Sequence, residues 1–151
     1  MMPIAGTSLE IIASSATATV GAQIAKCLIY TVIKKPVSYR MLVHTGGMPS
    51  SHSALVASLA TSVGLIEGFD ASLFAITIGF AVIVMYDAAG LRRSAGRMAG
   101  ILNQLTQEIY SNNPAKVPER LRELLGHTPI EVIVGALWGS LIAYLFNAML
   151  G

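Results

Sequence analysis

The sequence predicts an all-α integral membrane protein, a helical bundle of about four transmembrane helices with additional membrane-surface helices. Of the 151 residues, 54% are hydrophobic and 12% are charged, whereas an average soluble domain has about 25% charged residues. The mean hydropathy is +0.64, so the chain lacks the charged residues that a soluble surface of this size needs. The length predicts a single domain over residues 1–151.

Four apolar segments approach or exceed the roughly 20 helical residues that cross a bilayer. Only EGFD separates the second from the third, which predicts a tight helical hairpin, and Cys27 in the first segment is expected to pack within the bundle. Small residues in the first and last segments favour close helix contacts in lipid. The segments are residues 11–33, a run that starts within the motif at 44–54 and ends at residue 66, residues 71–86 and residues 130–150.

The basic residues predict how these segments are oriented. Nine of the ten lie in the first and third connections, and the tenth, Lys26, lies inside the first apolar segment. By the positive-inside rule both connections are cytoplasmic, which places both chain termini on the opposite side. The expected location is a bacterial inner membrane or an organelle membrane of bacterial origin, with membrane lipids as partners and no nucleic acid. The nine residues are Lys34, Lys35, Arg40, Arg92, Arg93, Arg97, Lys116, Arg120 and Arg122.

The third connection, residues 92–126, is too long for a turn and has a helical pattern. Apolar residues recur at helical spacing through SAGRMAGILNQLTQEIYS, and Pro118 suits the first turn of a second short helix, ERLRELL. We expect both helices to lie on the membrane surface or to pack as extensions under the bundle. The apolar positions of the first helix are Met98, Ile101, Leu102, Leu105 and Ile109.

The segment GGMPSSHSA, between the first two apolar segments, is the first motif that indicates chemistry. Its glycines, among them Gly47, let a ligand approach the backbone closely, and Pro49 suits the first turn of a helix. Free amides at such a helix start attract anions. Ser50 and Ser51 add hydroxyl donors, and His52 can donate a proton near neutral pH. The alternative is a serine-capped helix start with a histidine at the membrane interface.

A second motif, GHTPIEVIVGALWG, pairs His127 with Glu131 four residues later. The two share one face if a single helix covers both. Because Pro129 disfavours helical geometry at Thr128, the helix may instead begin near Thr128, with His127 just before it. In either geometry Glu131 can reach one ring nitrogen of His127, fix its tautomer and make the other nitrogen a better nucleophile. The alternative is a structural pair that satisfies the helix end.

A third motif, YDAAGLRRSAGR, closes the third apolar segment. Arg92 and Arg93 carry planar, permanently charged groups suited to phosphate oxygens, with Arg97 as a supporting cation. Asp87 lies within the apolar part and needs water or a cationic partner, for which an arginine of this motif or Lys26 is suitable. The alternative for Arg92 and Arg93 is ordinary flanking charge that fixes topology.

Together the three motifs resemble the divergent branch of the type 2 phosphatidic acid phosphatase superfamily, which is related to acid phosphatases and vanadium-dependent haloperoxidases. The resemblance covers the chain from Gly21 onward. It implies that His127 is a nucleophile that becomes transiently phosphorylated, that Glu131 orients it, and that His52 protonates the leaving oxygen. It also implies that Ser50 and Ser51, with the backbone amides around Gly47, cradle the phosphate oxygens. Arg92, Arg93 and Lys26 are the candidate cations of this cradle, and the two arginines can reach it only if residues 94–126 are an insertion that folds away.

The chain departs from the superfamily in several places. Ser51 stands where the superfamily has glycine, and Glu131 stands where it has aspartate. The Lys-x6-Arg-Pro and Ser-Arg-x5-His patterns of the superfamily are absent from the sequence. Four spans, rather than the six usual in membrane members, indicate a reduced bundle whose core a homodimer would cover.

The resemblance implies a membrane-embedded phosphatase that hydrolyses a lipid phosphomonoester through a phosphohistidine at the cytoplasmic interface, without a metal or other cofactor. A second class of function stays open, a non-catalytic membrane protein that binds or transports an anionic lipid or a small phosphate in the same pocket. Haloperoxidase activity with bound vanadate is a distant third, because a small membrane bundle gives no sign of a peroxide-handling pocket.

Overall fold

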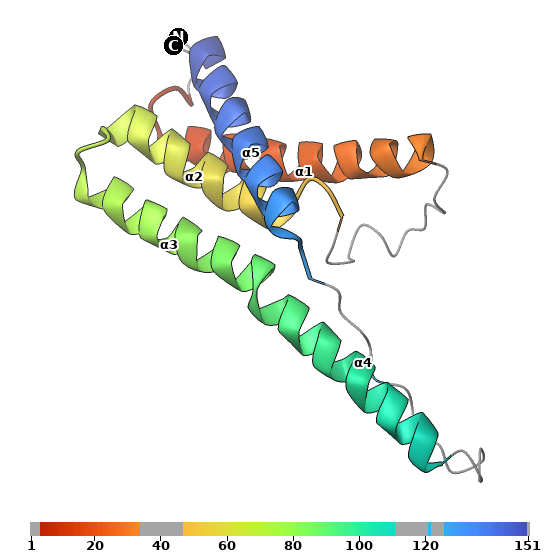
Figure 1. The fold of residues 1–151 in the computed structure, drawn as a ribbon. Helices are drawn as coiled ribbons and strands as arrows, with labels where there is room; N and C mark the ends of the chain where they lie inside the picture. Colours follow the sequence, from red (N-terminus) through yellow and green to blue (C-terminus); the bar gives the residue numbers. More distant parts are fainter. Residues whose placement is uncertain (1–3, 34–46, 111–120, 122–125, 151) are drawn as a thin grey trace.

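The computed structural model describes residues 4–33, 47–110, 121 and 126–150, with the backbone alone at 91–93. Over these residues the regular structure is entirely helical, as the sequence predicts. Helices α1, α2 and α5 pack together, α3 lies along α2, and α4 extends away from the bundle (Figure 1). The helices are α1 (Ser8–Val32), α2 (Ser51–Glu67), α3 (Ser72–Ala89), α4 (Leu91–Ile109) and α5 (Pro129–Leu150).

Three stretches of the described chain are long and apolar enough to cross a membrane: α1, the run from α3 through α4, and α5. Helix α2 is shorter, with 17 residues, and it contacts α1, α3 and α5. Large apolar side chains are exposed along α1, α3 and α5, where hydrocarbon rather than water would surround them. The predicted membrane helical bundle is therefore confirmed, with α2 as its central helix.

Two glycines allow α2 and α5 to cross in close contact. A Cβ atom at Gly135 would collide with the carbonyl oxygen of Ser50, and one at Gly139 would collide with that of Ala54. The two glycines are four residues apart, one turn of helix, so they lie on the same face of α5. This small-residue spacing fixes the start of α5 against the start of α2, as expected for helices that associate in lipid.

Helix α1 turns a regular stripe of residues toward α2 and α5. Its fully buried positions recur every four residues and begin and end with a charged side chain. The hydroxyl groups of Ser14 and Ser62 are 2.7 Å apart, which joins the early part of α1 to the end of α2. With this register Lys26, the last residue of the stripe, lies near the start of α2. The stripe consists of Glu10, Ser14, Ala18, Ala22 and Lys26.

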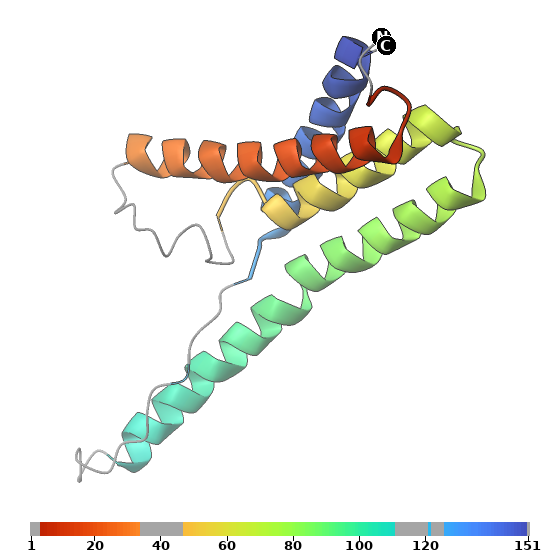
Figure 2. The same ribbon diagram turned by 180° about the vertical axis from the view of Figure 1, so that it is seen from behind.

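Helix α4 differs in part from the sequence-based expectation. The predicted helix after residue 94 is present, but it begins at Leu91 and continues the direction of α3 after a single glycine, Gly90 (Figure 2). The amide of Gly90 donates to the carbonyl of Tyr86, and the amide of Ser94 donates to Gly90, so helical bonding crosses the junction. The second predicted helix, ERLRELL, lies outside the described residues except for Leu121.

Candidate active site

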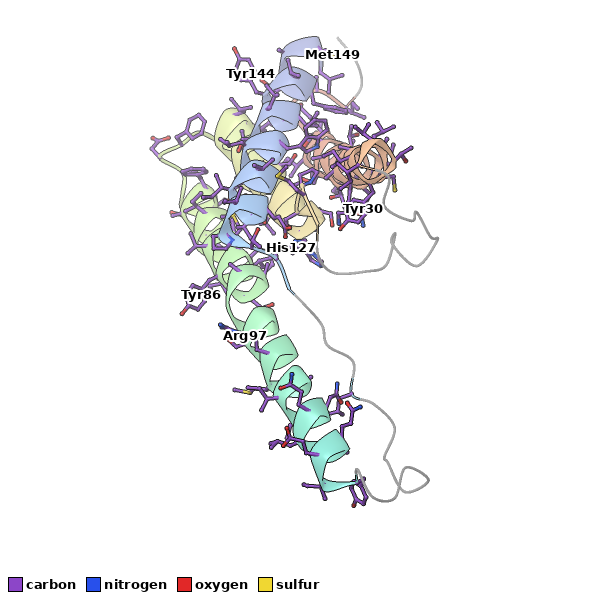
Figure 3. All side chains as sticks on the ribbon, turned by 45° about the vertical axis from the view of Figure 1, so that its right-hand side comes forward. Tyr30, Tyr86, Arg97, His127, Tyr144 and Met149 are labelled. Carbon is purple, nitrogen blue, oxygen red and sulfur yellow. The ribbon has the colours of Figure 1, made fainter. Side chains whose placement is uncertain are left out.

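The starts of α2 and α5 meet the end of α3 at one end of the bundle. The amide of Ser50 donates to the carbonyl of Glu131 (3.1 Å), and the amide of His127 donates to the carbonyl of Ala88 (3.1 Å). Figure 3 shows His127 at the start of α5, beside the start of α2. Three segments that are distant in the sequence are thus tied together by backbone hydrogen bonds around the predicted histidines.

The structure brings His52 and His127 together. Their ring centroids are 6.2 Å apart, and the ring planes are inclined at 64°. His127 is almost completely buried, with 1% of its surface exposed, and His52 is half-buried in the first turn of α2. Reacting groups approach to about 3 Å, so this separation suits a single tetrahedral group held between the two rings.

Glu131 has two roles in this geometry. Its Oε2 atom lies 3.2 Å from Nδ1 of His127 and also accepts a hydrogen bond from the amide of Thr128 (3.0 Å). The hydroxyl of Thr128 accepts from the amide of Glu131 (3.3 Å), which completes a capping box. Helix α5 begins at Pro129, so the second of the two predicted geometries is present, with His127 before the helix. The capping alternative applies to this carboxylate, and the same carboxylate also contacts His127 as the predicted catalytic pair requires.

Lys26 is a buried cation beside these residues. Its side chain is 1% exposed, and within the described part of the chain its Nζ atom has no hydrogen-bond partner. Its Cδ atom lies 3.4 Å from the place where a Cβ would stand on Gly47, and the charge of Glu131 acts on it. Burying an ammonium group costs several kcal/mol. An anion bound beside Lys26 would offset this cost.

The serines of the first motif have more local roles than predicted. Ser50 is the N-cap of α2, and its Oγ accepts hydrogen bonds from the amide (3.4 Å) and the hydroxyl (3.1 Å) of Ser53. Ser51 is buried in the first turn. Pro49 precedes this cap, so the prediction that it occupies the first turn of the helix is wrong. The capping alternative thus applies to Ser50, while the amides of the first turn still face the end of the bundle.

Gly47 adopts a backbone conformation that favours glycine, with φ at +85°. A Cβ atom there would also approach the Tyr30 hydroxyl to 2.9 Å. Tyr30 lies one turn beyond Lys26 on α1, and sequence reasoning missed it. The four-residue spacing from Lys26 is the signal that would have found it, once the inward face of α1 is known. The Thr-x-x-Glu spacing in the sequence similarly indicates the cap that Thr128 forms with Glu131.

The cations of the third motif are placed differently from one another. Arg92 and Arg93 lie in the first turn of α4, four and five residues after Ala88, and their side chains lie outside what the structure describes. Arg97 is exposed on α4, away from His127 (Figure 3), and its Nη2 donates to the Ser94 hydroxyl at 3.4 Å. Asp87 is half-buried one residue before Ala88. The structure thus does not bring Arg97 to the histidine pair.

Comparison with known proteins identifies the family. The divergent PAP2 family matches residues 7–142 of the chain, which include both histidines and Lys26. This chain belongs to the divergent PAP2 family. The protein is also 42% identical, over 147 residues, to the uncharacterised membrane protein YuiD of Bacillus subtilis (strain 168), a match that covers 88% of this chain and 93% of that protein. No solved structure matches the chain. The resemblance inferred from the motifs is confirmed.

This divergent PAP2 protein lacks the sequence patterns that supply phosphate-binding Lys and Arg residues in the wider superfamily. Among the described side chains, buried Lys26 of α1 lies against Gly47 before the start of α2, where the charge of Glu131 acts on it.

Proposed function

We propose that this divergent PAP2 protein is a metal-independent phosphatase that hydrolyses a lipid phosphomonoester through a phosphohistidine intermediate. The observation that supports it most is the approach of two imidazoles from distant parts of the chain to 6.2 Å between ring centroids, with buried Lys26 close enough for the charge of Glu131 to act on it. The start of α2 meets the start of α5 at the same place, and the amides in the first turn of α2 favour an anion there. Lys26 and these amides hold the phosphoryl oxygens in the proposed complex.

The first chemical step is attack of His127 on phosphorus. Because Nδ1 of His127 faces Glu131, Nε2 is the nitrogen that forms the P–N bond. The P–O bond to the lipid alcohol breaks, and His52 transfers its proton to the leaving oxygen. Glu131 stabilises the positive charge that develops on His127, as the carboxylate does in other activated histidine pairs.

In the second step water replaces the histidine. His52, now neutral, takes a proton from water, and the resulting hydroxide attacks phosphorus. The P–N bond breaks, inorganic phosphate leaves, and His127 and His52 return to their starting states. Lys26 acts in both steps as a fixed charge on the equatorial oxygens, where negative charge concentrates in the transition state.

A lipid substrate follows from where the site lies. The histidines are at the ends of apolar helices, so a headgroup can reach them while its acyl chains stay in hydrocarbon. Phosphatidic acid, phosphatidylglycerophosphate and polyprenyl phosphate each present a monoester phosphate of this kind. The basic connections make this end cytoplasmic by the positive-inside rule, in a bacterial inner membrane or an organelle membrane of bacterial origin.

A non-catalytic lipid or phosphate binder is the second candidate function. Arg97 donates to Ser94 and lies on α4 away from His127, which leaves fewer cations for a transition state than the superfamily resemblance implies. Such a protein would bind the same anion through Lys26 and the start of α2, without bond cleavage.

Release of inorganic phosphate from purified protein tests the proposal. The protein in detergent is given each of the three lipid monophosphates, without added metal and again with magnesium. We expect release from at least one lipid without metal, and loss of release in His127→Ala and His52→Ala while lipid binding persists. Lipid binding with no release by the parent protein would favour the second candidate.

A further inference from the structure

The run formed by α3 and α4 is longer than a bilayer is thick. It has 38 residues, about 57 Å of helix at a rise of about 1.5 Å per residue, whereas the hydrocarbon core is about 30 Å thick. Helix α3 packs on α2 and α5, while α4 projects from the bundle (Figure 1). The half of the run that leaves the hydrocarbon is therefore α4.

Helix α4 carries an exposed apolar stripe. Its large apolar side chains lie on one face in helical register and are between 48% and 75% exposed. The one described residue of the return segment, Leu121, contacts α4 on another face, through two 2.9 Å hydrogen bonds between its backbone and the Asn103 side chain. Within the described residues nothing covers the stripe, which consists of Met98, Ile101, Leu102, Leu105 and Ile109.

The charges of α4 indicate what covers this stripe. The helix has three arginines and one acidic residue, Glu108. In helical register Arg97 lies near one edge of the stripe. An apolar stripe on a helix with an excess of arginine is the pattern of a helix that lies in the headgroup region and is attracted to anionic lipids. The run leaves the hydrocarbon at the start of α4, so the bilayer surface is the surface nearest to the stripe.

We propose that α4 docks its apolar stripe on an anionic membrane surface, with Gly90 as the hinge between α3 and α4. Gly90 ends α3 and begins α4, and a glycine between two helices absorbs a change of direction at little steric cost. The docked helix places its arginines in the headgroup layer next to the end of α3. The proposal goes beyond the phosphatase function and does not depend on it.

Lipid quenching of a fluorophore on each face of α4 tests the docking. The full chain with Cys27→Ala is labelled at Leu105→Cys, on the stripe, or at Gln107→Cys, on the opposite face, and placed in phosphatidylcholine and phosphatidylglycerol nanodiscs that contain nitroxide lipids. We expect quenching at Leu105 to exceed that at Gln107 by roughly twofold or more. Met98→Cys on the stripe and Gly100→Cys on the opposite face form a second pair, which shows whether a local folding defect at one position causes the difference.

Two controls separate the alternatives. The contrast between faces is expected to shrink in phosphatidylcholine alone and in Arg97→Gln, because the electrostatic attraction is lost. Equal and weak quenching on both faces would overturn the docking. A stripe that is shielded from solvent only when two labelled copies of the chain associate would also overturn it. Phosphate release by the same preparations is a separate measurement, so docking without release would contradict only the phosphatase proposal.

Discussion

At the scale of single residues, Lys26 is the feature that most needs an explanation. A charged group inside a membrane segment is costly unless another charge or water compensates it. Glu131 acts on Lys26 electrostatically, but its carboxylate is already shared between His127 and Thr128. A phosphate held by Lys26 and the start of α2 would complete this compensation, so we expect a phosphate-like anion to stabilise the fold.

Replacing Lys26 by methionine tests this explanation. Because methionine fills a similar volume without a buried charge, we expect the unliganded protein to be more stable, by about 1 to 4 kcal/mol in free energy of unfolding. The stabilisation that tungstate, a phosphate mimic, gives to the parent protein is expected to disappear. Thermal unfolding in detergent with and without tungstate measures both effects. A destabilised Lys26→Met protein that still responds to tungstate would contradict the assigned role.

Two carboxylates at helix starts, buried Glu10 and half-buried Glu131, provide a comparison. Glu131 faces His127, whereas Glu10 accepts hydrogen bonds from the amide of Gly6 (2.7 Å) and the side chain of Asn147 (2.9 Å). Glu131→Gln keeps an acceptor for the cap but removes the charge that stabilises protonated His127. We expect it to lower the turnover number by at least about a hundredfold, while Glu10→Gln keeps turnover per folded molecule. Equal losses in the two variants would indicate a purely structural role for Glu131.

At the scale of helices, the close crossing of α2 and α5 positions the histidine pair. Each helix brings one histidine at or just before its start, and the glycines Gly135 and Gly139 set how near the two starts approach. Any change that separates these helices separates His52 from His127. The packing of small residues thus contributes to the site as well as to stability.

Alanine substitution at two glycines distinguishes the crossing from general helix effects. Gly139→Ala forces a Cβ against the backbone of Ala54, and we expect it to cost about 1 to 3 kcal/mol in the free energy of unfolding. A Cβ atom at Gly79, which lies on α3, would have no neighbour within 4 Å. Gly79→Ala is therefore expected to be neutral or stabilising by up to about 1 kcal/mol. Unfolding in detergent compares the two, and an equal response would count against the close crossing.

Much of the helical architecture is predictable from the sequence. Hydropathy and length identify the helices, and EGFD marks the hairpin, where Gly68 takes a φ of +99°. The continuation of α3 into α4 is not predictable, because Gly90 is equally compatible with a break. The expected place of Pro49 in the first turn is at least two positions too far into α2, because Ser50 provides the cap and the helix begins at Ser51.

The site is predictable only in part, for a physical reason. His52, His127 and Glu131 can be identified from the sequence because polar residues beside apolar segments are unusual. The position of Lys26 depends on which face of α1 turns inward, and that is set by contacts with α2 and α5 rather than by local sequence. The hydropathy of α1 alone does not show whether Lys26 or the arginines of the third motif supply the cation of the site.

At the scale of the whole molecule, the bundle has two distinct ends. Glu10 binds Asn147, so the start of α1 and the end of α5 share one end, and Ser14 and Ser62 bring the end of α2 to it. The histidines, Lys26 and the first arginines of α4 belong to the other end. This separation matches the predicted topology, in which the termini and the hairpin face one side and the basic connections face the other.

Cysteine labelling in intact cells tests this orientation. In a Cys27→Ala background, Phe69→Cys lies in the hairpin and Gln107→Cys lies in α4, and both positions are exposed. We expect a membrane-impermeant thiol reagent to label Phe69→Cys in intact cells, and Gln107→Cys only after the membrane is opened. The reverse pattern would place the histidines on the outer side of the membrane.

The most direct test of the central claim is detection of a phosphoryl group on His127. An aryl phosphate has a leaving group that needs no proton, so His52→Ala protein can form the phosphohistidine but lacks the base that activates water for its hydrolysis. We predict an acid-labile label that accumulates toward one per chain, maps to His127 by mass spectrometry, and is absent when His127→Ala is added. Binding of the aryl phosphate without any label on His127 would contradict the account.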